Sequence, residues 1–220
     1  MSLLLLDLDN TLIDRAAAFR RWAVAFAAAQ GAPSAEADWL VEEDGDGFKP
    51  RERFAAEIRE HFGLTGRQED DVLAELRAGV VENIVLDPGL PDALERARAA
   101  GWDRIVVTNG TVPQQERKLR HTGLVHQVDG CVISEGVGVR KPDPRIFRLA
   151  AERAGTSLDG AWMIGDSPEA DIQGAVNAGI SSVWLRRDRP WTITDFKPTL
   201  TKDSCVEAIG ALIATPPPAR

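Results

Sequence analysis

Two acidic side chains, two residues apart, follow the first apolar segment of the chain. The segment Leu3–Leu6 ends at Asp7, which opens the sequence Asp7-Leu8-Asp9-Asn10-Thr11. In an extended chain, residues two apart point to the same face, so the carboxylates of Asp7 and Asp9 are expected to lie close together. Two anions at short distance repel each other unless a cation lies between them or one of them holds a proton. The pair therefore predicts a cation site or a protonated carboxyl.

Polar residues also follow later apolar segments. Thr108-Asn109-Gly110 follows one such segment, Gly165-Asp166 follows another and leads to Asp171, and Arg140-Lys141-Pro142 precedes a predicted helix. In open parallel α/β sheets, ligands bind beyond the carboxyl ends of the strands, so these groups are expected at one rim. Carboxylate oxygens are ligands that Mg²⁺ prefers, and a lysine and a hydroxyl supply charge and hydrogen bonds for a phosphoryl group.

Each of these residues also has an ordinary structural explanation. An aspartate at a strand end is more often a turn former or a helix N-cap than a catalyst. Thr108-Asn109-Gly110 alone is typical of a turn, and Lys141 before a proline is typical of a solvated loop. Their occurrence together, in this order and next to predicted strands, favours a shared site.

The segments between these residues predict a parallel sheet. Five short apolar runs, each bounded by Gly, Asp, Asn or charged residues, are typical of buried strands. Helical patterns alternate with them, which predicts βαβ units and an α/β fold. The predicted strands are 3–6, 105–107, 131–133, 162–164 and 182–185, and the predicted helices between them are 92–100, 113–121, 145–154 and 169–178.

A helical insertion interrupts this alternation after the first predicted strand. Residues 15–87 contain helical patterns without a convincing strand, and Asp87-Pro88-Gly89 closes the insertion with turn-forming residues. We expect one domain formed by residues 1–14 and 88–220 and a second, helical domain formed by residues 15–87. The helical patterns of the insertion lie at 16–30, 36–43, 51–61 and 68–83, and a last helix is predicted near 205–213.

Composition and charge exclude several classes of protein. Of the 220 residues, 44% are hydrophobic and 27% charged, as in ordinary globular proteins, and the formal net charge is −8. No stripe of Lys and Arg is present, so nucleic acid is not an expected partner. The run Leu3–Leu6 is too short for a signal peptide or a membrane span, and Cys131 and Cys205 have no paired spacing. We expect a cytoplasmic protein that does not bind membranes, and leave monomer or homodimer open.

The chain resembles the haloacid dehalogenase (HAD) superfamily of hydrolases. The resemblance extends from Leu3 to Trp184 and rests on four motifs in the order of the family. It implies a Rossmann-like parallel sheet with helices on both faces as the catalytic core, and the insertion is similar to the family's helical C1 cap. The motifs are matched by Asp7-Leu8-Asp9-Asn10-Thr11, Thr108-Asn109, Lys141-Pro142, and Gly165-Asp166 with Asp171.

The resemblance implies a role for each motif. Asp7 would attack phosphorus and become an aspartyl phosphate, and Asp9 would protonate the leaving alcohol and then deprotonate the hydrolytic water. Lys141 would neutralise charge between Asp7 and the phosphate. Mg²⁺ would be held by the Asp7 carboxylate, the Asp9 backbone carbonyl and the Asp166 carboxylate, and Asp171 would orient Lys141 or a metal-bound water. The residues expected to bind the phosphoryl group are Thr108, Asn109, Gly110 and Lys141.

The implied activity is Mg²⁺-dependent hydrolysis of a small phosphomonoester, such as a nucleotide or a sugar phosphate. The dehalogenase branch of the family lacks an aspartate at the position of Asp9, so its presence favours phosphatase chemistry. Substrate choice in capped members comes from the cap, where residues 42–51 are expected to form a polar loop. That loop either carries specificity through Lys49 or Arg51 or is a solvated connection between helices.

Three alternatives to this activity are open. A phosphotransferase or phosphomutase of phosphosugars would pass the phosphate from Asp7 to a second hydroxyl, which requires the exclusion of water. A phosphonatase would use Lys49 to form a Schiff base with an aldehyde substrate. A non-catalytic binding protein would be expected to lack one of the key carboxylates, yet Asp7, Asp9 and Asp166 are all present.

Overall fold

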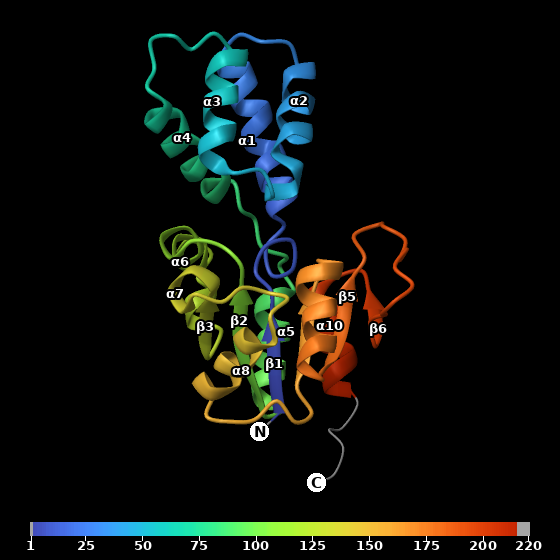
Figure 1. The fold of residues 1–220 in the computed structure, drawn as a ribbon. Coiled ribbons are helices and arrows are strands. Elements are labelled where there is room, and N and C mark those ends of the chain that lie inside the picture. The colour runs from blue at the N-terminus through green and yellow to red at the C-terminus, as the bar shows by residue number, and fades with distance from the viewer. Residues whose placement is uncertain (1, 215–220) are drawn as a thin grey trace. The chain divides into compact units, whose positions relative to one another are not determined.

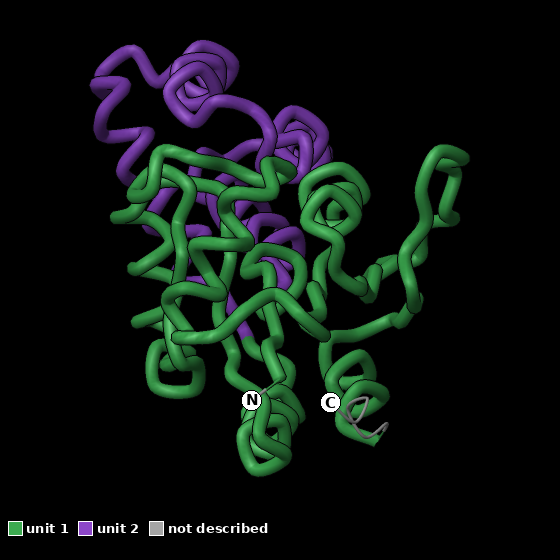
Figure 2. Tube along the Cα trace, turned by 60° about the horizontal axis from the view of Figure 1, so that its bottom comes forward, with its two compact units in different colours: residues 1–13, 86–220 green, residues 14–85 purple. Residues whose placement is uncertain are grey.

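The structure is a computed structural model that describes residues 2–214 of the chain. It divides into two compact units, coloured separately in Figure 2. Unit 1 comprises Met1–Ile13 and Leu86–Arg220, and unit 2 comprises Asp14–Val85. Every helix within residues 2–214 is too short or too polar to cross a lipid bilayer.

Unit 1 is built on a six-stranded sheet in the order β3-β2-β1-β4-β5-β6 (Figure 1). All neighbouring strands are parallel, which confirms the predicted α/β fold. In the central strand β1, Leu5 is in register with Ile105 on one side and with Met163 on the other. The strands are β1 (Ser2–Leu6), β2 (Trp102–Thr108), β3 (Gly130–Ile133), β4 (Trp162–Gly165), β5 (Ser181–Leu185) and β6 (Leu200–Lys202).

The edge strand β6 is not predicted by the sequence analysis. Its residues Leu200-Thr201-Lys202 form no apolar run, and the first two are exposed. An edge strand has one neighbour and is not buried on both faces, so the continuous apolar pattern of the inner strands is absent. The strand is defined instead by its pairing with β5, in which Val183 is in register with Leu200.

Helices cover both faces of the sheet. On one face, α8 contacts β1, β2 and β3, and Phe147 packs in a buried cluster with Leu3 and Leu5. Leu4 and Leu6 alternate with these leucines and are equally buried, so the second face is covered as well. There, α5 contacts β2 and α10, and α10 contacts β5. The helices of unit 1 are α5 (Leu90–Ala99), α6 (Val112–His121), α7 (Ser134–Val137), α8 (Pro144–Arg153), α9 (Gly174–Ala178) and α10 (Cys205–Ala214).

Local sequence signals explain where the helices next to the strand ends begin. α8 begins at Pro144, and the Asp143 side chain accepts a hydrogen bond of 2.9 Å from the backbone N–H of Arg145. After β4, the predicted helix 169–178 begins as a π-helical segment, Pro168–Gln173, and continues as α9. The Ser167 hydroxyl caps this segment by accepting a hydrogen bond from the backbone N–H of Ala170. Single π-helical turns occur frequently at functional sites.

Unit 2 consists of helices around a core of its own. That core includes Phe19, Phe54 and Leu76, all almost fully buried. Gly79 lets α4 approach α1, because a Cβ at this position would lie 2.0 Å from the indole of Trp22. The helices are α1 (Arg15–Ala29), α2 (Ala35–Asp44), α3 (Arg51–His61) and α4 (Glu69–Glu82), with a 3₁₀ turn, η1, at Gly45–Gly47.

The segment predicted to be a loop at residues 42–51 is more regular than expected. α2 continues to Asp44, the 3₁₀ turn follows directly, and α3 begins at Arg51. Asp44 is 2% exposed, and its carboxylate accepts hydrogen bonds from the guanidinium groups of Arg15 and Arg51. The polar, glycine-containing sequence predicts a loop, but long-range pairing with Arg15 anchors the turn, and sequence spacing does not reveal that contact.

Candidate active site

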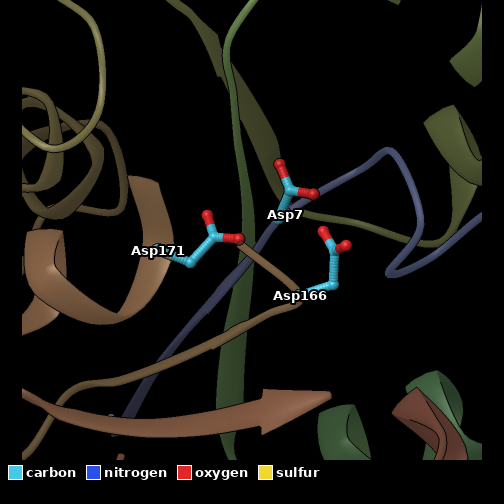
Figure 3. A group of neighbouring side chains, drawn as sticks. All are labelled: Asp7, Asp166 and Asp171. Atoms are coloured by element: carbon cyan, nitrogen blue, oxygen red, sulfur yellow. The ribbon is translucent and has the colours of Figure 1, made fainter. Parts of the chain in front are cut away.

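Three aspartates from separate parts of the chain meet at the carboxyl ends of β1 and β4 (Figure 3). Asp7 follows β1, Asp166 follows β4, and Asp171 lies in the π-helical segment. One carboxylate oxygen of each residue lies within 4.8 Å of those of the other two, and all three residues are buried. The approach of Asp171 to the strand requires Gly165, because a Cβ there would lie 2.3 Å from the Asp171 carboxyl carbon.

Lys141 supplies a buried positive charge to this cluster. Its Nζ donates hydrogen bonds to Asp7 Oδ1 and to Asp171 Oδ1, each at 2.6 Å. Asp171 Oδ2 accepts a hydrogen bond of 2.9 Å from the backbone N–H of Ser167. Asn109 binds the backbone of Lys141 twice: its Nδ2 donates to the carbonyl at 3.1 Å, and its Oδ1 accepts from the N–H at 2.9 Å. The chain after β2 therefore fixes the loop that carries the lysine.

Burial and mutual repulsion shift the ionisation of these groups. Burial raises the pKa of Asp7 to about 8, against the opposing charge of Lys141 and with added repulsion from Asp171 and Asp166. Burial also raises the pKa of Asp166 to about 7, with Asp171 adding to the shift. Burial alone would lower the pKa of Lys141, but the carboxylates of Asp171 and Asp7 outweigh it and the pKa is raised. Lys141 thus stays an ammonium beside carboxylates that are not fully compensated.

The carboxylate cluster fits a magnesium ion. Mg²⁺ prefers oxygen ligands, commonly one or two carboxylates together with water and phosphate oxygens. The raised pKa values of Asp7 and Asp166 mean that a cation placed near them would stabilise their ionised forms. Of the expected ligand residues, Asp7 and Asp166 belong to the cluster of three carboxylates, whereas the Asp9 side chain is directed elsewhere.

The Asp9 side chain lies in a second polar cluster, formed with residues of α6. Lys118 Nζ donates to both carboxylate oxygens of Asp9, at 2.7 Å each. Gln115 Nε2 donates to Asp9 Oδ2 at 3.0 Å and to Thr108 Oγ1 at 2.6 Å. The chain turns after Asp9 at Asn10, whose φ of 60° is in the left-handed region that asparagine tolerates. Asp9 and Thr108 are therefore linked through Gln115.

Two arginines that follow β5 contact Asp166. Arg187 Nη1 donates to Asp166 Oδ2 at 2.9 Å, and Arg189 Nη2 donates to the Asp166 carbonyl at 2.8 Å and to Oδ2 at 3.2 Å. The indole N–H of Trp184 donates to the same carbonyl at 2.9 Å. The backbone turns at Arg187 and Asp188, whose φ values of 46° and 58° are in the left-handed region. This turn lies in the segment from which Arg187 and Arg189 both reach Asp166. Asp166 is thus held by the neighbouring strand and its following loop.

Asn109 and Gly110, expected to bind a phosphoryl group, make contacts within the protein. The Asn109 side chain binds the Lys141 backbone, and the Gly110 N–H donates to Ser134 Oγ at 3.0 Å. Gly110 has a φ of 146°, and a Cβ there would lie 3.1 Å from Gln115 Cδ. These contacts indicate that Asn109 positions Lys141 and that Gly110 leaves room for Gln115. Their binding to a phosphoryl group stays a prediction.

Four residues of the site were not predicted from the sequence, namely Gln115, Lys118, Arg187 and Arg189. Gln115 and Lys118 are 1% and 2% exposed and three residues apart on one helix face, but a polar face lacks the apolar pattern that indicates burial. Arg187, by contrast, follows the predicted strand 182–185. The expectation that polar residues beyond strand ends form the site applies to it as well.

The two cations considered for specificity, Lys49 and Arg51, are both paired within unit 2. The Lys49 ammonium forms ion pairs with Glu43 and Glu57, and these hydrogen bonds raise the pKa of Lys49. Arg51 Nη1 donates to Asp44 Oδ1 at 2.6 Å. A lysine that forms a Schiff base must react as the neutral amine, so the surroundings of Lys49 oppose that role.

Proteins that are similar to the chain in sequence include phosphatases. Over 103 residues, the chain is 41% identical to the phosphoserine phosphatase of Thermus thermophilus, covering 46% of this chain and 41% of that protein. Over 99 residues, it is 40% identical to the pyrimidine 5'-nucleotidase YjjG of Escherichia coli, covering 40% of this chain and 44% of that protein. The matched region spans less than half the length of these curated relatives.

A solved structure extends the likeness to nearly the whole chain. The protein YfnB of Bacillus subtilis, described as a HAD hydrolase and crystallised with magnesium, has a TM-score of 0.76 and is 24% identical, covering 97% of this chain and 99% of that one. At this identity the likeness concerns the fold alone. The model of the family "haloacid dehalogenase-like hydrolase" matches residues 1–179. The chain belongs to the haloacid dehalogenase-like hydrolase family.

Proposed function

We propose that this chain is a Mg²⁺-dependent phosphatase of small phosphomonoesters that works through an aspartyl phosphate on Asp7. The observation that carries the proposal is the setting of the Asp7 carboxylate. It lies at the end of the central strand, 2.6 Å from the Lys141 ammonium and within 4.8 Å of oxygens of Asp166 and Asp171. A carboxylate beside a fixed cation is suited to attack a phosphoryl group whose charge that cation neutralises. The phosphatase and nucleotidase named as relatives support the same class of reaction.

The proposed reaction has two halves. In the first, an oxygen of Asp7 attacks phosphorus in line with the leaving alcohol, the bond from phosphorus to the alcohol oxygen breaks, and Asp9 gives its proton to that oxygen. In the second, water attacks the phosphorus of the aspartyl phosphate while Asp9 accepts a proton from the water. The bond from phosphorus to Asp7 breaks, and inorganic phosphate leaves. Asp7 and Asp9 both return to their starting states, and one water is consumed.

The remaining residues of the site would bind and orient. Lys141, held by Asp171 and by the Asn109 side chain, would reduce the repulsion between the Asp7 carboxylate and an anionic phosphoryl group. The carboxylates of Asp7 and Asp166 and the backbone carbonyl of Asp9 are the groups proposed to hold Mg²⁺, which would supply charge stabilisation at a phosphoryl oxygen.

Unit 2 is proposed as the C1 cap that selects the substrate, with residues 15–87 inserted between the parts 1–14 and 88–220 of the catalytic core. The proposed substrates are small phosphomonoesters, such as nucleotides or sugar phosphates. We do not extend the proposal to a phosphonatase, because Lys49 is paired with two glutamates. A phosphotransferase would share the aspartyl phosphate, and its product would be an isomerised phosphosugar rather than free phosphate.

The proposal is tested by a screen of the purified protein against a panel of small phosphomonoesters, with release of inorganic phosphate as the readout. We expect hydrolysis in the presence of Mg²⁺, loss of activity with EDTA, and recovery when Mg²⁺ is added in excess. The Asp7→Asn variant, screened in parallel, controls for contaminating phosphatases. A folded protein that releases no phosphate from any member of the panel, or that isomerises a phosphosugar instead, would contradict the proposal.

A further inference from the structure

Lys118 and Gln115 of α6 are buried beside the proposed acid–base group, and the reaction described above assigns them no role. We infer that Lys118, assisted by Gln115, is a positioning residue. It holds the Asp9 carboxylate in the orientation that proton exchange with the leaving group and with water requires. This inference rests on the proposed function and goes beyond it, because it names the residues through which the fold orients Asp9.

The Lys118 ammonium carries three N–H donors, and acceptors lie close to it. Its Nζ donates to Asp9 Oδ1, to Asp9 Oδ2 and to Gln115 Oε1, each at 2.7 Å. Burial of an ammonium group is unfavourable unless acceptors of this kind surround it. Because both oxygens of the Asp9 carboxylate accept from Lys118, the buried end of Lys118 fixes the orientation of that carboxylate.

Gln115 fixes the arrangement further. Its Oε1 accepts from Lys118, so its Nε2 is directed to Asp9 Oδ2 at 3.0 Å and to Thr108 Oγ1 at 2.6 Å. Gly110 makes this possible, since a side chain there would meet Gln115. The Gln115 amide therefore ties the acid–base carboxylate to the Thr108 hydroxyl at the end of β2, which the family resemblance predicts to bind the phosphoryl group.

The exposed fractions of Lys118 and Asp9 distinguish this ion pair from a purely structural one. The side chain of Lys118 is 3% exposed, whereas that of Asp9 is 24% exposed. In the structural pair of unit 2, by contrast, both side chains are buried, with 7% exposure for Arg15 and 2% for Asp44. Asp9 is thus held from its inner side by a buried cation while part of the carboxylate stays accessible, as a group that exchanges protons with a bound ligand must be.

The test uses two substrates that differ in their need for an acid. An alkyl phosphate, taken from the panel above, has a poor leaving group that must be protonated, whereas p-nitrophenyl phosphate has a leaving group that departs with little protonation. For Lys118→Met we expect kcat/KM to fall by about 100-fold or more with the alkyl phosphate and by less than about 10-fold with p-nitrophenyl phosphate. Gln115→Met should show a smaller change in the same direction. Arg120→Met, which alters an exposed cation on the same helix, is the matched control and should leave both values unchanged.

The ratio of the two kcat/KM values is the decisive quantity, because both are measured on one preparation and any misfolded fraction cancels. A loss by the same factor for both substrates would overturn the inference and leave Lys118 as a structural residue. Wild-type kcat/KM values for both substrates in both Lys118→Met and Gln115→Met would overturn it as well. A wild-type protein that hydrolyses neither substrate would instead contradict the proposed function, so the two failures are distinguishable.

Discussion

Unit 1 and unit 2 each contain a buried cluster of charged side chains, and the two clusters are balanced in opposite ways. In unit 2, the carboxylate of Asp44 accepts hydrogen bonds of 2.6–2.8 Å from Arg15 and Arg51. Burial opposes the charge of Asp44, but the hydrogen bonds and charges of the two arginines outweigh burial and lower the pKa. Cations exceed carboxylates in this cluster, and its anion is fully compensated.

In unit 1, at the strand ends, burial outweighs the neighbouring cations. Asp7 and Asp171 bind the ammonium of Lys141, and Arg187 and Arg189 contact Asp166, yet burial raises the pKa of Asp7 to about 8 and that of Asp166 to about 7. The contrast separates a structural cluster from a functional one. A carboxylate whose pKa is lowered by its cations gains little from a ligand, whereas carboxylates whose pKa is raised by burial and by neighbouring carboxylates are stabilised by a bound cation.

The largest expected effect is the loss of turnover in Asp7→Asn. Removing the proposed nucleophile should lower kcat by at least about 10³-fold. Stability should stay within about 1 kcal/mol of the wild type, since the change also removes one of the mutually repelling carboxylates. Activity assays and urea unfolding check the two parts. Asp159→Asn, at an exposed position of unit 1, is the control, and near-normal hydrolysis by Asp7→Asn would exclude the mechanism.

The second effect is a loss of stability when the buried ion-pair cluster of unit 2 is broken. Asp44→Asn leaves the buried guanidinium groups of Arg15 and Arg51 without their anion, and should destabilise the protein by about 3 kcal/mol. Asp38→Asn removes an aspartate of the exposed pair with Arg20 and should cost less than about 1 kcal/mol. Urea unfolding of the two variants gives the comparison. An equal loss of unfolding free energy in the two variants would show that the cluster of Asp44, Arg15 and Arg51 does not anchor the turn that follows α2.

The third effect is stabilisation by Mg²⁺. At a concentration ten times its Kd, the ion should stabilise the folded wild-type protein by about 1.4 kcal/mol. Thermal unfolding with and without Mg²⁺ measures this shift. Asp166→Asn should lose most of it, whereas Asp38→Asn should keep it. A shift of the same size in Asp166→Asn would mean that the ion binds elsewhere.

The fourth effect is on the pH dependence of stability in the presence of EDTA. The pKa values of Asp7 and Asp166, about 8 and about 7, lie above the ordinary value of 3.8, so the folded protein binds more protons than the unfolded chain. The free energy of unfolding should therefore fall as pH rises from 3.8 to about 8, by less than about 1.4 kcal/mol per pH unit for each carboxyl.

The lowered pKa of Asp44 acts in the opposite direction, because its contribution to stability is lost as pH falls below 3.8. Urea unfolding from below pH 3.8 to about pH 8 checks both signs. The decline with rising pH should be shallower in Asp166→Asn than in the wild type. An increase in stability from pH 3.8 to about 8 would contradict the raised pKa values of Asp7 and Asp166.

The sequence was sufficient for the parallel sheet because the inner strands are buried on both faces and appear as apolar runs. β6 at Leu200–Lys202 lacked that signal, since it is an exposed edge strand held by pairing with β5. For the site, the strand-end positions pointed to Asp7, Asp166 and Lys141, which the structure brings together with Asp171.

The supporting residues are harder to predict. Lys118 and Gln115 are buried by contact with Asp9, more than 100 positions away in the chain, and a helix face of polar residues is ordinarily solvated. Residue types next to strand ends predict the groups that we propose to react, but not the buried side chains that contact them. Such long-range polar contacts become visible only when the fold places the elements together.

Trapping of the intermediate tests most directly whether Asp7 carries the phosphoryl group. The protein is mixed with its substrate and Mg²⁺, quenched during turnover, reduced with borohydride and analysed by tandem mass spectrometry. Reduction of an aspartyl phosphate gives homoserine, and we expect homoserine at position 7 with substrate and none without it. Continued turnover with Asp7 unmodified, or reduction at a different carboxylate, would contradict the proposed mechanism.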